Sequence, residues 1–279
     1  MQEYHFISGL PRSGSTLLAA LLAQNPHFHA SMSSPVGSLF KSIQSVMHPR
    51  HESSIQLKTE TRHRLLEGVF HNYYADKKEK DFIFDTNRQW TSELAILNKI
   101  FPKAKVLCCV RNPAWIMDSF EQQFVKHPFD VPGLFDNEGE RGTVYTRLES
   151  LALYDRVFGF AWSSLKEAFY GANAKDLLLI DYDLLTQAPE ETLRLVYKFL
   201  DIPYYKAHDF NNVNFDSKAF DKHLGMPSLH TVRKKVQFTA RKTILPPDLF
   251  ERFNNLAFWN DSAQSAAHVI AIQQEKGTK

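Results

Sequence analysis

The sequence is poor in cysteine, with two cysteines in 279 residues. Cys108 and Cys109 are adjacent, and neighbouring residues of an extended strand point to opposite faces, so we do not expect an ordinary disulfide between them. They are interpreted as core thiols of a protein in a reducing compartment. The sequence also lacks any run of about 18 apolar residues, so no segment is predicted to span a membrane.

The first residues, Met1–His5, lack both the positively charged start and the long apolar stretch of a secretory signal peptide. Together with the sparse cysteine, this favours a cytoplasmic location. We therefore expect a cytoplasmic enzyme or binding protein.

The chain has no excess of either charge, since 33 Lys and Arg face 31 Asp and Glu for a formal net charge of +2. This balance excludes the broad basic surface of a non-specific nucleic-acid binder, so no nucleic-acid partner is expected and any anion site must be local. A composition of 43% hydrophobic and 23% charged residues is ordinary for a globular protein. A single domain over residues 1–279 is predicted, with a weakly patterned tail from about Gln264 that is expected to fray.

Short apolar runs alternate with segments of helical periodicity along the chain. Strands are predicted at 4–8, 82–85, 105–110 and 177–181, and helices at 16–22, 39–47, 59–74, 90–100, 143–170, 189–202 and from 246. Because a parallel pair of strands needs a long crossover, this alternation predicts βαβ units. The expected fold is an α/β three-layer sandwich around a mostly parallel central sheet, with a first strand, turn and helix like those of a phosphate-binding loop.

The turn after the first predicted strand carries the most informative motif. Residues 9–16 fit the spacing G-x-x-x-x-G-K-[ST], except that Ser15 occupies the lysine position. Successive backbone N–H groups and the helix N-terminus form an anion cradle, to which Ser13, Ser15 and Thr16 add hydroxyl groups and Arg12 a cation. The alternative is a Gly/Ser turn that merely joins a strand to a helix.

A second motif ends the third predicted strand with Val110-Arg111-Asn112-Pro113, and Ser119 follows on the next helix. A Mg²⁺-dependent triphosphatase would place an acidic metal ligand at such a strand end. The arginine found there favours a second anion site instead, because open α/β sheets bind ligands at the carboxyl ends of their strands. Taken alone, Arg111 is also compatible with a surface salt bridge.

Together the two motifs resemble those of sulfotransferases that use 3′-phosphoadenosine 5′-phosphosulfate (PAPS), and the resemblance covers about residues 4–250. Pro-Arg-Ser-Gly at 11–14 is closer to the bacterial and tyrosylprotein-like branch than to the cytosolic small-molecule branch. The resemblance implies that the first loop holds the 5′-phosphosulfate and that Arg111 and Ser119 hold the 3′-phosphate. The residues of that first loop are Pro11, Arg12, Ser13, Gly14, Ser15, Thr16 and Leu17.

Two later segments extend the resemblance. Residues 181–189 and 199–203 resemble the family's tyrosine-containing strand end and the helix after it, which implies that Tyr182 lies near the adenine. The basic stretch 229–235 is where the family often closes a loop over the 3′-phosphate, which implicates Arg233 and Lys234. The implied cofactor is PAPS, released as adenosine 3′,5′-bisphosphate (PAP). No metal is expected, because a sulfonate carries less charge than a γ-phosphate and backbone N–H groups with one or two cations suffice to hold it.

The general base is the least certain residue in sequence terms. The segment that follows the first helix carries no carboxylate, although the tyrosylprotein-like branch uses a glutamate there. Asp85, at the end of the second predicted strand, is therefore the first candidate base, and Arg88 is a candidate for steadying the sulfonate beside Arg12. A turn-capping role for Asp85 stays open, and His230 is the second candidate.

The predicted function is transfer of a sulfonate group from PAPS to a hydroxyl or amine acceptor, and the predicted class is a sulfotransferase enzyme. The alternative is a non-catalytic binder or sensor of adenosine 3′,5′-bisphosphate-type nucleotides. The acceptor stays open among hydroxylated small molecules, sugars, lipids and peptides, and the oligomeric state cannot be read. The aromatic, Gly/Pro-punctuated loop 124–135 is a candidate lid.

Overall fold

The computed structural model describes residues 2–127, 134–223 and 230–271. The strands are β1 (Glu3–Gly9), β2 (Phe28–Ala30), β3 (Phe82–Thr86), β4 (Val106–Val110), β5 (Leu177–Asp181) and β6 (His268–Ile270). The longer helices are α1 (Ser15–Leu22), α2 (Val36–Val46), α3 (Thr59–Tyr73), α5 (Pro113–Lys126), α7 (Val144–Ala152), α8 (Val157–Tyr170), α10 (Pro189–Leu200) and α12 (Pro247–Asn254). The shorter ones are α4 (Leu94–Ile100), α6 (Glu138–Arg141), α9 (Tyr182–Gln187) and α11 (Lys218–His223), with 3₁₀ turns at Glu52–Gln56, Arg88–Thr91, Ala174–Asp176 and Phe258–Asn260.

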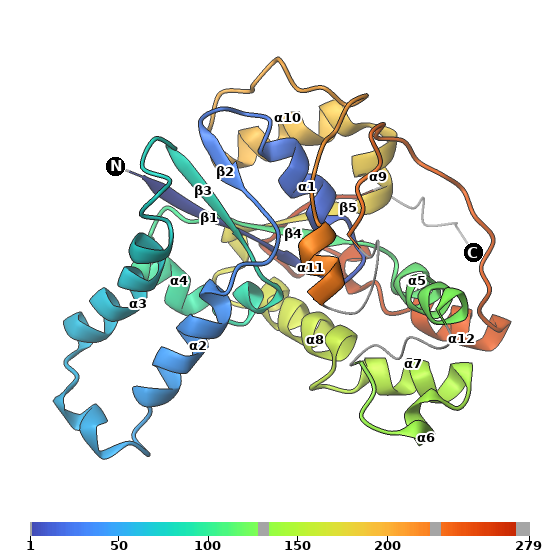
Figure 1. Ribbon diagram of the computed structural model, residues 1–279, viewed down its shortest axis with the longest axis horizontal. Coiled ribbons are helices and arrows are strands. Elements are labelled where there is room, and N and C mark those ends of the chain that lie inside the picture. Colours follow the sequence, from blue (N-terminus) through green and yellow to red (C-terminus); the bar gives the residue numbers. More distant parts are fainter. Residues whose placement is uncertain (1, 128–133, 224–229, 272–279) are drawn as a thin grey trace.

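One six-stranded sheet organises the molecule, in the order β2-β3-β1-β4-β5-β6. All of its strand pairs are parallel, so the predicted α/β class and parallel sheet are confirmed. Figure 1 shows α1, α9 and α10 on one face of the sheet and α3, α4 and α8 on the other, which is the expected three-layer arrangement. In the part of the chain that the structure describes, no helix is long and apolar enough to cross a membrane.

Successive side chains of a strand point to opposite faces of the sheet, so neighbouring residues pack into different hydrophobic clusters. Cys108 packs with residues of α3, α4 and α8, whereas Cys109 packs with residues of α1 and α10. Both thiols are buried and unbridged, as the adjacency of the two cysteines predicts. Burial raises the pKa of each thiol, so both remain neutral packing groups.

Several elements differ from the sequence-based expectation, among them the short helices α6, α9 and α11, which no predicted helix covers. The edge strand β2 was not predicted, because a three-residue strand carries too little periodicity to be recognised. The long helix expected over 143–170 is divided into α7 and α8, between which Leu153 has extended dihedral angles. Part of the tail expected to fray, residues 268–270, pairs with β5 as the edge strand β6.

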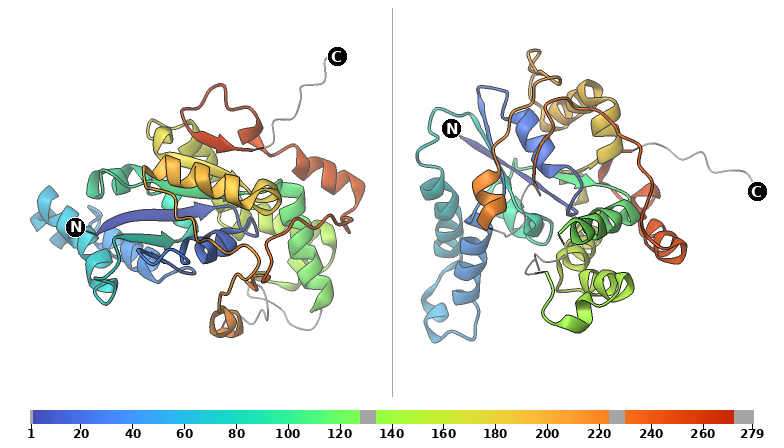
Figure 2. Two further views of the ribbon diagram at one scale, coloured as in Figure 1. Left: turned by 90° about the horizontal axis from the view of Figure 1, so that it is seen from above. Right: turned by 45° about the vertical axis from the view of Figure 1, so that its right-hand side comes forward.

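The parallel sheet places the ends of β1, β3, β4 and β5 along one edge. The register pairs Ile7 with both Thr86 and Leu107, and Val110 with Asp181. The loops that carry the two predicted motifs therefore leave the sheet side by side, at the edge where open α/β sheets bind ligands. Figures 1 and 2 place α2 and α3 at one end of the molecule and α5, α6, α7 and α12 at the other.

The turn after β1 requires glycine at its first position. Gly9 has φ 108°, and a Cβ built on it would lie 2.1 Å from the carbonyl oxygen of Cys109. This approach brings the phosphate-loop backbone directly onto β4, where the amide of Leu10 donates to the same carbonyl over 2.9 Å.

We therefore expect Gly9→Ala to lower the free energy of unfolding by about 2 kcal/mol or more, because both the positive φ and the backbone contact become unfavourable. Gly68→Ala is the matched control. Gly68 lies inside α3, where the added methyl group would meet the Asn72 side chain at 3.7 Å, so a small gain from helix propensity is expected. Urea unfolding of the two variants measures the difference, and equal stabilities would contradict this account of Gly9.

Candidate functional site

A cavity of about 1340 Å³ opens at the carboxyl edge of the sheet. It is lined by the phosphate loop, the entrance to α2, the segment after β3, one side of α5, the start of α8 and the segment 230–241. One of the described lining residues is acidic, Asp155, and eight are Lys or Arg: Arg12, Arg88, Arg111, Lys126, Arg156, Arg233, Lys235 and Arg241. Basic side chains therefore gather at this cavity on a nearly neutral protein, and such a lining favours an anionic ligand.

The phosphate loop has an unusual backbone. Gly14 has φ 94°, and Arg12, which is not a glycine, has φ 59°. Left-handed residues within a turn direct successive N–H groups into one concavity, which suits an anion. Pro11, Arg12 and Gly14 line the cavity together with Ser15, Thr16 and Leu17, and α1 begins at Ser15 directly behind them.

Ser13 differs from its neighbours in the loop. Its side chain is 1% exposed, and its hydroxyl lies within hydrogen-bond distance of two carbonyls, that of Leu10 and that of Cys109 at 2.8 Å, which share its one proton. Ser13 is also absent from the described lining of the cavity. The expectation that this hydroxyl contacts the ligand is therefore corrected, because the hydroxyl instead ties the loop to the end of β4.

Arg111 and Tyr182 lie together behind the loop. The guanidinium of Arg111 stacks 4.4 Å from the centre of the Tyr182 ring, and a Cβ on Gly14 would meet that ring at 2.6 Å. Nε of Arg111 is buried without a hydrogen-bond partner among the described residues, since the nearest carboxylate oxygen, on Asp183, is 3.9 Å away. A buried guanidinium with an unused donor is a site prepared for an anion.

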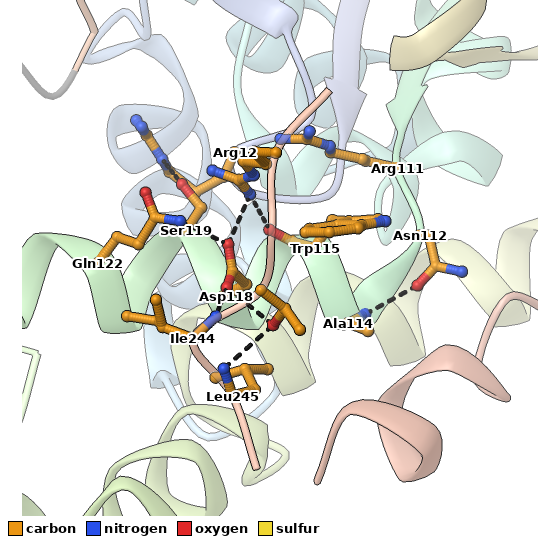
Figure 3. A network of polar contacts seen from close by, with 12 residues as sticks. Arg12, Arg111, Asn112, Ala114, Trp115, Asp118, Ser119, Gln122, Ile244 and Leu245 are labelled. Carbon is orange, nitrogen blue, oxygen red and sulfur yellow. Dashed lines mark hydrogen bonds and ion pairs between the residues drawn. The ribbon is translucent and has the colours of Figure 1, made fainter. Parts of the chain in front are cut away.

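Ser119 is placed differently from the prediction that paired it with Arg111. It lines the cavity from α5, but its hydroxyl accepts a hydrogen bond from Nε of Arg12 over 3.2 Å (Figure 3). This contact joins the two predicted motifs through their side chains. It also orients the Arg12 guanidinium, whose pKa is lowered to about 10 by burial and by the charges of Arg111 and Arg241.

Arg241 is a cavity residue that the sequence interpretation missed. Its guanidinium donates to the carbonyl of Trp115 over 2.9 Å and forms an ion pair of 3.1 Å with Asp118. Asp118 is fully buried on α5 and also accepts from the amide of Ile244 and the hydroxyl of Thr243 (Figure 3). In the sequence, the only local feature of this site is a second basic residue, Lys242, next to Arg241. The partner carboxylate, Asp118, lies more than a hundred residues earlier and cannot be recognised from the local pattern.

The basic segment near residue 233 only partly matches expectation. Arg233 and Lys235 line the cavity, whereas Lys234 does not. The carbonyl of Lys234 accepts from the amide of Val213 over 2.7 Å. The prediction for Lys234 is therefore corrected to Lys235. Leu229, at the start of the predicted stretch, lies outside the described residues.

Asp85 does not face the cavity. It is fully buried and accepts hydrogen bonds from Ser34 over 2.5 Å, Tyr74 over 2.5 Å and the indole of Trp90 over 2.8 Å. Burial raises the pKa of Asp85, while these donors act in the opposite direction. The expectation that Asp85 is the general base is corrected, because its oxygens are occupied in holding β3 to the segment before α2 and to α3.

Arg88 and His230 do line the cavity. The Arg88 side chain is exposed to the cavity while protein surrounds it on its other sides, and this burial lowers its pKa. His230 lies within electrostatic reach of both Arg12 and Arg88. Three of the residues predicted for the chemistry, Arg12, Arg88 and the second candidate base, thus meet in one space.

The aromatic residues of the candidate lid pack against α7 and against each other. Phe124 packs 3.9 Å from the guanidinium of Arg147, and Phe135 packs edge-on against Phe124, while Phe129 lies outside the described residues. The lid over 124–135 therefore stays a prediction. In the described ranges, no three His, Cys, Asp or Glu side chains gather as a metal site would require.

The chain matches the model of the sulfotransferase family over residues 5–206, and it belongs to that family. Among curated proteins, it is 26% identical over 216 residues to the nodulation protein NoeE of Sinorhizobium fredii (strain NBRC 101917 / NGR234). This alignment covers 68% of the chain and 48% of NoeE, so the chain spans about half the length of that relative.

Two solved structures share the fold. The sulfotransferase domain of the Synechococcus PCC 7002 olefin synthase aligns with a TM-score of 0.50 at 17% identity, over 92% of this chain and 95% of that one. The sulfotransferase domain of the curacin biosynthetic pathway aligns with a TM-score of 0.52 at 15% identity, over 92% of each chain.

The position of Asp85 yields a test that separates stability from catalysis. Asp85→Asn should lower the free energy of unfolding by about 1.5–3 kcal/mol, because an amide cannot accept from all three donors. Asp81→Asn, at an exposed carboxylate that pairs with His27, is the matched control and should change stability little. Chemical unfolding measures both. A stable Asp85→Asn variant that binds nucleotide but has lost turnover would restore Asp85 as the base.

Proposed function

We propose that this protein transfers a sulfonate group from PAPS to a hydroxyl or amine acceptor. The observation that carries the proposal is the convergence of Arg12, Arg111 and Arg241 on the phosphate loop. The cavity lining has eight cationic residues and one acidic one. Family membership supplies the reaction class, and this cation set supports the doubly phosphorylated product PAP as the nucleotide that is held.

The residues present fit such a nucleotide. The unused donor of Arg111 and its stacking on Tyr182 provide a guanidinium for the 3′-phosphate and an aromatic face for the adenine. Burial and the charge of Arg241 lower the pKa of Arg111, which is the response expected of cations held close together. The loop N–H groups and Arg12 suit the 5′-phosphosulfate.

The bound donor supplies an activated sulfonate, and the chain supplies binding, alignment and charge stabilisation. The loop N–H groups and Arg12 would stabilise the negative charge that develops on the leaving phosphate. Arg88, which follows the neighbouring strand β3, would hold the sulfonate and align it with the acceptor oxygen. Ser15 in place of the lysine leaves less positive charge at the loop, which matches a sulfonate better than a γ-phosphate.

The remaining wall of the cavity supports a polar, hydroxylated acceptor more than a long-chain lipid alcohol. Serine and amide side chains dominate the entrance to α2 and the inner side of α5, where Ser33, Ser38, Gln122 and Gln123 line the space. Such groups can exchange hydrogen bonds with the hydroxyl groups of a polar acceptor, which a long-chain alcohol lacks along its chain.

Turnover tests the proposal directly. The protein is incubated with labelled PAPS and separate sugar, peptide, phenol and lipid acceptors, with Mg²⁺ chelated. Acceptor-dependent release of PAP is expected, most strongly with polar acceptors. Binding of PAP without turnover of any acceptor would favour the alternative, a nucleotide sensor.

A second prediction concerns Arg111. Arg111→Ala should weaken PAP binding by about ten- to 100-fold, because a charge-assisted contact to a phosphate contributes about 1.5–3 kcal/mol, whereas adenosine 5′-monophosphate should bind almost as before. Calorimetric titration with both nucleotides measures this. The control is Arg194→Ala, at a half-exposed arginine on α10 that pairs with Glu190. Equal losses for the two nucleotides would count against the assignment of Arg111 to the 3′-phosphate.

A further inference from the structure

Because Asp85 is buried in the core, another residue of the cavity must accept the proton of the acceptor hydroxyl. Among the described lining residues, two side chains can accept a proton at neutral pH, Asp155 and His230. Asp155 is exposed beside Arg156 at the start of α8. His230 lies instead within electrostatic reach of Arg12 and Arg88, the two cations that flank the proposed sulfonate position.

His230 is held by a buried carboxylate that the sequence interpretation did not single out. Nδ1 of His230 lies 2.6 Å from Oδ1 of Asp221, and the backbone amide of His230 donates to Oδ2 over 3.1 Å. The hydroxyl of Ser217 donates to Oδ2 as well, over 3.3 Å. Asp221 is 2% exposed, so these contacts form away from solvent.

We propose that Asp221 is a positioning residue that orients His230 as the general base for the acceptor hydroxyl. This inference rests on the proposed function and names its proton acceptor. A carboxylate can only accept hydrogen bonds, so Nδ1 of His230 carries the proton and Nε2 carries the lone pair. Asp221 accepts two hydrogen bonds from His230, one from the ring and one from the backbone amide. Together they fix the tautomer and the position of the ring.

The transfer needs only the acceptor hydroxyl, PAPS and His230. The acceptor O–H bond breaks and its proton passes to Nε2 of His230, while the acceptor oxygen forms a bond to sulfur. The bond between sulfur and the bridging oxygen breaks, and its electron pair leaves on the 5′-phosphate of PAP. Asp221 stays ionised and stabilises the imidazolium that forms, without taking the proton itself.

The charged groups that face His230 decide how its activity responds to pH. Burial lowers its pKa below the ordinary value of 6.5, Asp221 raises it, and Arg12 and Arg88 lower it. A base works only when unprotonated, so turnover should fall as the pH drops through the pKa of His230. Replacing Asp221 by asparagine removes the group that raises this pKa, so the acid limb of the profile should move to lower pH.

The test compares Asp221→Asn with the wild type and with Asp216→Asn, an exposed aspartate of the same segment. For Asp221→Asn we expect kcat to fall about 10²- to 10⁴-fold, PAP affinity to stay within about twofold, and the acid limb to shift to lower pH. Asp216→Asn should match the wild type. A merely structural role for Asp221 would lower PAP affinity or stability together with kcat and would leave the acid limb in place.

A second variant keeps the inference testable where Asp221→Asn folds poorly. His230→Ala should lose the acid limb, and added imidazole should restore part of its rate in a cavity of this size. Unchanged kcat in a folded variant at either position, or no rescue by imidazole, overturns the assignment while leaving the sulfotransferase proposal intact. A wild type that binds PAP but turns over no acceptor overturns both.

Discussion

Mutual repulsion among buried guanidinium groups is the constraint around which the site is arranged. Burial and the charges of Arg111 and Arg241 lower the pKa of Arg12, and burial and the charge of Arg241 lower the pKa of Arg111. Each of the three arginines is held by a different part of the chain. The phosphate loop holds Arg12, the end of β4 holds Arg111, and an ion pair to Asp118 on α5 holds Arg241. An anion of matching shape that binds among these guanidinium groups would relieve their mutual repulsion.

The surrounding fold serves to keep these cations in place. The parallel register aligns the ends of β1, β3, β4 and β5, and the contact of Gly9 with Cys109 seats the loop on the sheet. The hydroxyl of Ser13 donates its one proton to the carbonyls of Leu10 and Cys109 in the same region. This hydroxyl was expected to contact the ligand, but it instead holds the backbone of the phosphate loop in place.

The two carboxylates considered for proton transfer illustrate how environment decides a role. Asp85 has three protein donors and no access to the cavity, so its charge serves the core. Asp221 is equally buried, yet one of its partners is a histidine that lines the cavity. The same chemical group is therefore structural in one place and, on our proposal, acts through His230 in the other. Access to the cavity separates the two cases, and access is a property of the packed structure.

The sequence by itself determined the fold class and the positions of both anion-binding motifs, because strand-turn-helix periodicity and the 9–16 spacing are local properties of the chain. It did not determine which polar side chains would reach the cavity. The structural roles of the Ser13 hydroxyl and of Asp85 depend on contacts between residues distant in sequence. The same holds for Arg241, whereas the direction of an extended backbone brings Lys235 rather than Lys234 to the cavity. Such contacts form only when the layers pack, so the tertiary structure decided them.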